Sequence, residues 1–117
     1  MKEISIFIQS MNKNLIYRIG KNAQNNFDLI DMSDPDDIWF HINNKASEHV
    51  VLSVPNEISF TKKQMKDAIT QGALLCKIHS KYKSNSNVEI VYTEIKNIKK
   101  TSVVGSVTIK NSKIKII

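Results

Sequence analysis

Residues 38–42 read Ile-Trp-Phe-His-Ile, and this run of β-branched and aromatic side chains decides the fold around it. It predicts a strand whose side chains alternate between two faces, with the isoleucines and the phenylalanine on the core face. Trp39 and His41 then share the opposite face. Two interpretations of that pair stay open. Either a helix covers it and satisfies both N–H groups, or the indole and the imidazole form a site that stacks on or titrates a ligand.

The length and composition are those of one domain. At 117 residues the chain predicts a single domain, 1–117, with one modest core. No apolar run approaches the roughly 18 residues of a membrane span, and a short alternating strand follows Met1 where a signal peptide would be apolar. We therefore expect a cytoplasmic protein without a membrane partner. Cys76 is the only cysteine, which excludes an internal disulfide and fits a reducing compartment.

The net charge of +6 is divided unevenly along the chain. Residues 1–60 carry five basic and eight acidic side chains, whereas residues 61–117 carry twelve lysines and three acidic side chains. A step of this size suggests that one face of the domain meets a polyanion, and nucleic acid is the leading partner of that kind. The alternative is a solvated, lysine-rich surface.

Hydrophobic periodicity predicts an α+β domain with a largely antiparallel sheet and two helices. The expected strands are 4–9, 15–19, 38–42, 49–54, 88–93, 103–109 and 114–117. The first helix is capped by Asn22 and carries Ala23, Phe27 and Ile30 on its apolar side. The second helix begins with a capping box at Thr61 and has small residues in its apolar stripe, which would let it lie close to a sheet.

Several motifs occur in an order that matches a known family. They are Gly20-Lys21-Asn22 with Asn26, Asp37-Ile38-Trp39-Phe40-His41, Ser47-Glu48-His49-Val50-Val51, Tyr92-Thr93 with Lys96-Asn97-Ile98-Lys99-Lys100, and Gly105-Ser106-Val107. With these motifs the chain resembles the NFACT RNA-binding domain family, the C-terminal module of proteins that work on stalled large ribosomal subunits. It looks closest to the short members, in which this domain is nearly free-standing or is followed by a coiled coil. The resemblance implies transfer or ribosomal RNA as the partner and a link to ribosome-associated quality control.

Two positions depart from the family pattern. Phe27 stands where long multi-domain members tend to carry an acidic residue. Ala46-Ser47-Glu48 replaces the Pro-Gly-Ser that the family places before its second histidine. Glu48 therefore puts a negative charge beside the expected site, where it would either weaken phosphate binding or pair with a histidine.

The side chains expected to bind nucleic acid combine aromatic faces, a phosphate seat and point charges. Trp39 and Tyr92 would stack on splayed bases, and Gly20-Lys21-Asn22 places amides and a lysine at a helix N-terminus. Arg18 suits a bidentate phosphate contact. The alternatives are that Gly20 only starts a helix and that Lys99-Lys100 is a solvated turn. The full predicted set is Arg18, Lys21, Asn22, Trp39, His41, His49, Tyr92, Lys96, Lys99 and Lys100.

His41 and His49 raise a catalytic alternative. If their strands pair so that His41 opposes His49, both imidazoles lie on one face, whereas a shift by one residue would separate them. With Asp37 nearby, such a pair suits general acid–base cleavage of RNA. Cys76 and His79 make only half of a zinc site, and core packing is the preferred explanation for both residues. We therefore expect no catalytic residue, no metal and no cofactor.

The sequence thus favours a non-enzymatic nucleic-acid-binding domain, with RNA preferred over DNA as the partner. Two other functions stay open. One is an adaptor that docks on the ribosome or on a partner protein through the same basic face, and the other is a hydrolase acting on RNA. Steep salt dependence of binding would favour nucleic acid over the adaptor, because each neutralised phosphate releases counterions.

Overall fold

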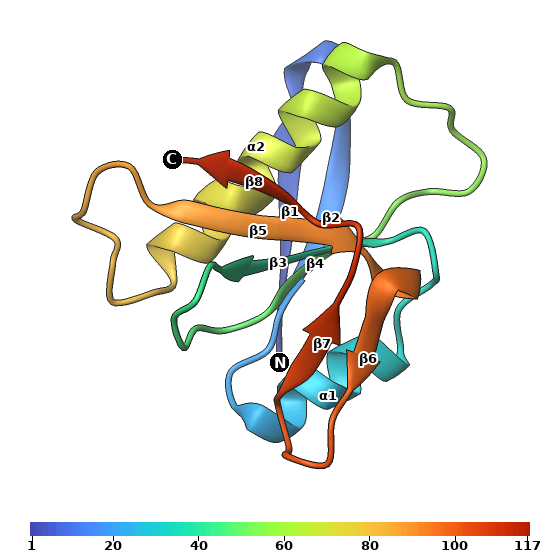
Figure 1. Cartoon of the computed structure of the whole chain (residues 1–117). Helices are drawn as coiled ribbons and strands as arrows, with labels where there is room; N and C mark the ends of the chain where they lie inside the picture. The colour runs from blue at the N-terminus through green and yellow to red at the C-terminus, as the bar shows by residue number, and fades with distance from the viewer.

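The computed structural model describes residues 1–117, and Figure 1 shows α2 lying across the sheet while α1 lies beside the β6–β7 hairpin. The helices are α1 (Ala23–Asp31) and α2 (Lys62–Ile78), and short 3-10 turns span Gln9–Met11 and Ile95–Asn97. The strands are β1 (Lys2–Ile8), β2 (Lys13–Ile19), β3 (Ile38–Ile42), β4 (Val50–Leu52), β5 (Glu89–Glu94), β6 (Ile98–Lys100), β7 (Val107–Ile109) and β8 (Lys113–Ile116).

Six of the strands form one sheet in the order β1-β2-β4-β3-β5-β8, and β6 pairs with β7 in a separate hairpin. All neighbouring strands run antiparallel. The prediction of an α+β domain with a largely antiparallel sheet and two helices is therefore confirmed. Neither helix has the length and apolar character that crossing a membrane would require.

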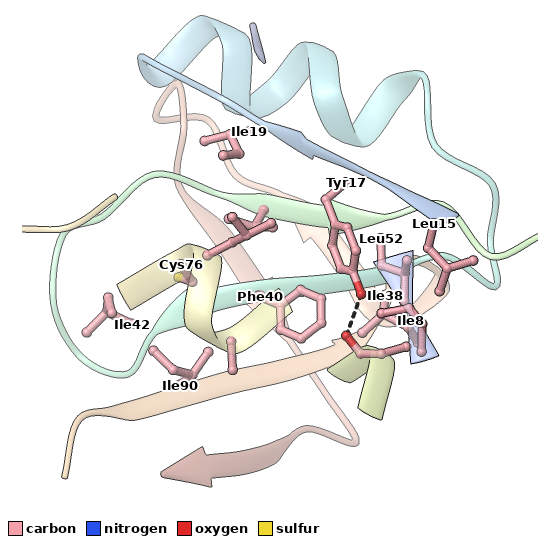
Figure 2. Packing of buried hydrophobic residues seen from close by; sticks show 14 of the residues in the cluster. Ile8, Leu15, Tyr17, Ile19, Ile38, Phe40, Ile42, Leu52, Cys76 and Ile90 are labelled. Carbon is pink, nitrogen blue, oxygen red and sulfur yellow. Dashed lines mark hydrogen bonds between the residues drawn. The ribbon is translucent and has the colours of Figure 1, made fainter. Parts of the chain in front are cut away.

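One face of the sheet packs against α2 and forms the larger core. Phe40 is fully buried at the middle of this core, together with side chains from β1, β2, β4 and β5 (Figure 2). Tyr17 crosses from the sheet to the helix, where its hydroxyl donates to the carbonyl oxygen of Ala68 at 2.7 Å. The predicted capping box at Thr61 is present and starts α2 at Lys62. Small residues along α2 bring the helix close to the Phe40 ring.

The opposite face has a smaller core of its own. Leu29 of α1 packs with Trp39, Val51 and Val91 from the sheet, and Ile98 and Val107 of the hairpin pack against this cluster. The hairpin and α1 thus cover the central strands on this side. Trp39 lies inside the cluster, because the second face is closed by these two elements.

Several details differ from the expectation, and the expected strand 103–109 is shortened to β7, because residues 102–106 form the turn of the hairpin. The return strand is shorter than 49–54 and spans Val50–Leu52, and the basic run after β5 contains an unpredicted strand, β6. In α1 the buried side chains are Asn26 and Leu29, whereas Ala23 is exposed. Asn26 is buried because its side-chain oxygen accepts a hydrogen bond from the His49 N–H in the loop before β4. The periodicity of apolar residues does not reveal this contact.

Replacing Gly72 by alanine should destabilise the domain by about 1–3 kcal/mol, although alanine is the better helix former. A Cβ at this position would lie 2.3 Å from the phenyl ring of Phe40, which is itself fully buried and has no room to move. Urea unfolding measures the loss, with the exposed Lys66→Ala of the same helix as the control within about 0.5 kcal/mol of wild type. A Gly72→Ala protein as stable as wild type would show that this contact is not tight.

Candidate nucleic-acid interface

A cleft of 580 Å³ lies where the end of β2, the end of β3 and the start of β4 meet. Four further segments border it: the N-terminus of α1, the loop before β4, the residues after α2 and the tip of the β6–β7 hairpin. The lining residues are Lys21, Asn22, Ala23, Asn26, His41, Ala46, Ser47, Glu48, His49, His79, Ser80, Lys81, Val104, Gly105 and Ser106.

Two glycines let these segments approach closely. A Cβ on Gly20 would lie 2.2 Å from the side-chain oxygen of Asn26, and that oxygen accepts from the His49 backbone N–H at 3.2 Å. Gly105 has a φ of +84°, and a Cβ there would lie 2.9 Å from Ala23. The hairpin tip therefore packs directly on the first residue of α1.

The N-terminus of α1 offers unpaired donors to the cleft. The Asn22 side chain caps the helix by accepting from the Asn25 N–H at 2.8 Å. The amides of Ala23 and Gln24 have no acceptor in the protein, as expected for the first turn of a helix. Lys21 is exposed directly before the cap. Together with the positive end of the helix dipole, these groups favour an anion at this point.

The two histidines lie on one face of the sheet. Phe40 pairs with Val50, so the same register sets His41 across from His49, with ring centroids 5.1 Å apart. The Trp39 Nε1–H donates to His49 Nδ1 at 3.1 Å. His41 Nδ1 donates to the Ile42 carbonyl oxygen at 2.7 Å. In the neutral pair the proton of His49 is therefore on Nε2, and Nε2 of His41 carries a lone pair.

Both imidazoles are held in the neutral form. Burial lowers the pKa of His49 to about 3, with a smaller contribution from the charge that His41 would carry. Burial also lowers the pKa of His41, against the opposing effect of backbone hydrogen bonds to Ile42 and Ser47. At neutral pH the pair thus contributes hydrogen-bonding groups to the cleft and no positive charge.

The structure corrects the role expected for the aromatic side chains. Trp39 is 2% exposed and stacks on His41, so it presents no open face to a base. Tyr92 pairs with Phe40 and packs at the edge of the α2 core, on the other side of the sheet. The two rings are separated because Trp39 pairs with Thr93 of β5, so the neighbouring Tyr92 faces α2 while Trp39 faces α1. Trp39 therefore has no open face for the predicted stacking, whereas base stacking on the half-buried Tyr92 stays a prediction.

Four of the predicted basic residues lie outside the cleft. Arg18 donates to the Ser53 hydroxyl and pairs with Glu3, and Lys96 pairs with Asp36 and Glu94. Lys100 pairs with Asp31, whereas Lys99 on the same hairpin has no ion pair. Lys21, Asn22, His41 and His49 are the members of the predicted set that the fold gathers.

Sequence reasoning missed the contribution of the C-terminal end of α2. His79 is the C-cap of this helix, and Ser80 and Lys81 follow it along the wall of the cleft. No local pattern connects these residues to Lys21, because the contact depends on where α2 ends over the sheet. His79 and Cys76 belong to no cluster of three or more possible metal ligands.

Comparison with known proteins shows the family. The family described as NFACT protein RNA binding domain matches residues 4–111, which is nearly the whole chain. The chain belongs to this family. Several of the motif residues that suggested it lie at the cleft: Gly20 and Gly105 allow its close contacts, and His41 and His49 lie side by side.

The relatives of this NFACT domain are longer proteins. Coiled-coil domain-containing protein 25 of Danio rerio is 35% identical over 94 residues, which cover 72% of this chain and 41% of the relative. The Bos taurus protein of the same name is 34% identical over 94 residues, covering 72% of this chain and 40% of the relative. Rqc2 homolog RqcH of Bacillus subtilis (strain 168) is 33% identical over 85 residues, covering 70% of this chain and 13% of the relative. The chain thus spans at most about two fifths of these proteins.

A solved structure has the same fold. The C-terminal part of the fibronectin/fibrinogen-binding protein from Streptococcus suis superposes with a TM-score of 0.78 at 24% sequence identity. The match covers 95% of this chain and 44% of that one. At this level of sequence identity the similarity establishes only the fold. The ligand of the NFACT domain has to be inferred from the chemistry of the cleft.

Proposed function

We propose that this chain is a non-enzymatic RNA-binding domain and that it binds RNA through the cleft at the N-terminus of α1. The observation that carries the proposal is the convergence of Lys21, Lys81 and the first amides of α1 with the His41–His49 pair, in a chain of the NFACT RNA-binding family. Family membership supports RNA as the partner, and the geometry supports this place on the surface.

The cleft supplies what RNA recognition needs. The α1 amides and the lysines provide phosphate contacts, whereas hydroxyl, imidazole and carboxylate groups on the remaining walls provide hydrogen bonds for a base or a ribose. The neighbouring hairpin adds Lys99 as a further point charge along the RNA backbone. Lys96 and Lys100 would exchange their exposed carboxylate partners for phosphate, at a small cost because exposed ion pairs are weak.

The chemistry of the histidines supports binding over catalysis. Cleavage of RNA by two histidines needs one imidazolium that donates a proton to the leaving oxygen at neutral pH. With a pKa of about 3, His49 is neutral there, and its Nδ1 is occupied by the Trp39 indole. We therefore assign both rings to structure and hydrogen bonding.

Transfer or ribosomal RNA is the partner that this proposal favours. The relative named Rqc2 homolog RqcH points to ribosome-associated quality control as the process, and this process would place the protein in the cytoplasm. The unpaired strands and loops of structured RNA offer splayed bases, and a cleft of this size can accept such a base. A regular duplex offers none, because its bases are paired and stacked.

Replacing Lys21 and Lys81 together by glutamine should weaken RNA binding about tenfold or more, because two phosphate contacts are lost. Fluorescence anisotropy with labelled transfer RNA at several salt concentrations measures the effect. For single-stranded contacts, the slope of log K against log salt should fall by about 1.4. Lys13→Gln is the matched control, since Lys13 is exposed at the other end of β2 and should leave binding within about twofold.

The remaining outcomes separate the alternatives. If Lys13→Gln weakens RNA binding as much as the double substitution does, the lysines contribute only nonspecific charge and the cleft is not a defined binding site. Stronger binding of duplex DNA than of transfer RNA would overturn the RNA assignment. No saturable binding of either nucleic acid would sink the proposal and favour an adaptor that docks on a partner protein.

A further inference from the structure

The cleft contains a ring donor that no group of the protein binds. His49 is 2% exposed and lines the cleft. Its Nδ1 accepts from Trp39, which puts the ring proton on Nε2, and no hydrogen bond within the protein uses Nε2. Ser10 Oγ is the fully enclosed side-chain polar atom without a partner, so His49 Nε2 is still accessible, and a ligand atom in the cleft that accepts a hydrogen bond would be its partner. The unpaired amide of Ala23 at the start of α1 borders the same cleft and favours the same chemistry.

The adjoining wall has the opposite character. Glu48 precedes His49 and lines the cleft, and none of the ion pairs in the protein includes its carboxylate. Its backbone oxygen lies 4.0 Å from the Cys76 Sγ of α2, which places this residue on the α2 side of the loop. His79 at the end of α2 also lines the cleft. The cleft thus includes an acceptor-only carboxylate that no ion pair of the protein occupies.

We infer that the cleft holds one unpaired guanine nucleotide of the RNA, with its phosphate at the N-terminus of α1 and its Watson–Crick edge on Glu48. This inference rests on the proposed function. Guanine presents two adjacent donors, N1–H and the N2 amino group, which match the two oxygens of a carboxylate. Adenine and cytosine place an acceptor next to their amino group, and uracil flanks its one donor with two carbonyl oxygens, so each of these bases meets repulsion at one carboxylate oxygen.

The inference also accounts for a negative charge inside an anion-binding cleft. A site for phosphate alone would lose affinity from Glu48, because like charges repel. A site for a whole nucleotide uses the carboxylate at the base end and the amides at the phosphate end. The volume of 580 Å³ lies within the roughly 300–1,000 Å³ of small-molecule sites, enough for one nucleotide.

The test uses the whole chain and four labelled oligouridine RNAs of equal length that differ at one central position, which is G, A, C or U. We expect the G oligomer to bind about tenfold more tightly than the U oligomer, in the range for one bidentate base contact. In Glu48→Gln this preference should fall below about twofold, with binding of the U oligomer unchanged or tighter because a repelling charge is gone. Glu57→Gln is the matched control, since Glu57 is an exposed acid in the loop between β4 and α2 and should keep the preference.

The outcomes keep the two proposals apart. Equal binding of all four oligomers, or a G preference that survives Glu48→Gln, would overturn the guanine assignment while leaving RNA binding in place. Loss of the preference in both variants would overturn it too, because net charge would then be the cause. Failure of every oligomer and of transfer RNA to bind would reject the proposed function together with this inference.

Discussion

Replacing Trp39 by alanine should lower the free energy of unfolding by about 3–5 kcal/mol, the range for truncating a large buried aromatic side chain. The indole is 2% exposed and packs with Leu29, Val51, Val91 and Ile95, so its removal leaves a cavity between the sheet and α1. The variant also removes the donor to His49 Nδ1. Urea unfolding followed by circular dichroism measures the change.

This result matters for any binding experiment on Trp39. A loss of RNA affinity in the alanine variant would reflect a damaged fold, since the ring offers no open face for stacking. Trp39→Phe is the control that separates the two effects, because it keeps most of the packing and loses the hydrogen bond, at a cost of about 1–3 kcal/mol. If Trp39→Ala instead unfolds like wild type and only binding is lost, a direct contact with RNA would be established.

The stability of the domain should fall steeply between pH 6.5 and about pH 3. In the folded protein burial lowers the pKa of His49 to about 3, whereas the unfolded chain has an ordinary histidine with a pKa near 6.5. Between these values the unfolded state binds the extra proton, so His49 favours folding fully above pH 6.5 and less at each lower pH. One proton taken up on unfolding corresponds to about 1.4 kcal/mol per pH unit.

A variant without an ionisable side chain at position 49 separates the contribution of His49 to the acid sensitivity from that of the carboxylates. In His49→Asn the amide oxygen takes a place near that of Nδ1 and can accept from the Trp39 indole, while no proton is gained on unfolding. Chemical unfolding at half-unit steps of pH should give a shallower acid limb for this variant. Identical slopes for wild type and His49→Asn would exclude His49 as the acid-sensitive group.

The local structure of this NFACT domain could largely be predicted from its sequence. The alternation through 38–42 places Phe40 toward one core and Trp39 toward the other face, and the structure has both in those positions. The capping box at Thr61 and the cap at Asn22 begin the two helices as expected. These features depend on neighbours within a few residues, which the sequence displays directly.

The strand register that brings the two histidines together could not be predicted from the strand pattern alone. Phe40 and Val50 both face α2, so their strands pair in the register that also brings His41 opposite His49. A shift by one residue would have turned the apolar side chains of β4 toward the wrong face. The sequence contained both possibilities, and the burial of one common core decided between them.

The cleft itself was decided by tertiary structure alone. Lys21, His49, Lys81 and Gly105 come from four separate segments, and no spacing along the chain indicates that they meet. Tertiary packing likewise buried Trp39, because α1 and the β6–β7 hairpin close over the second face of the sheet. The alternation of side chains along a strand indicates which face of the sheet a residue occupies. Which elements cover that face depends on segments far away in the sequence.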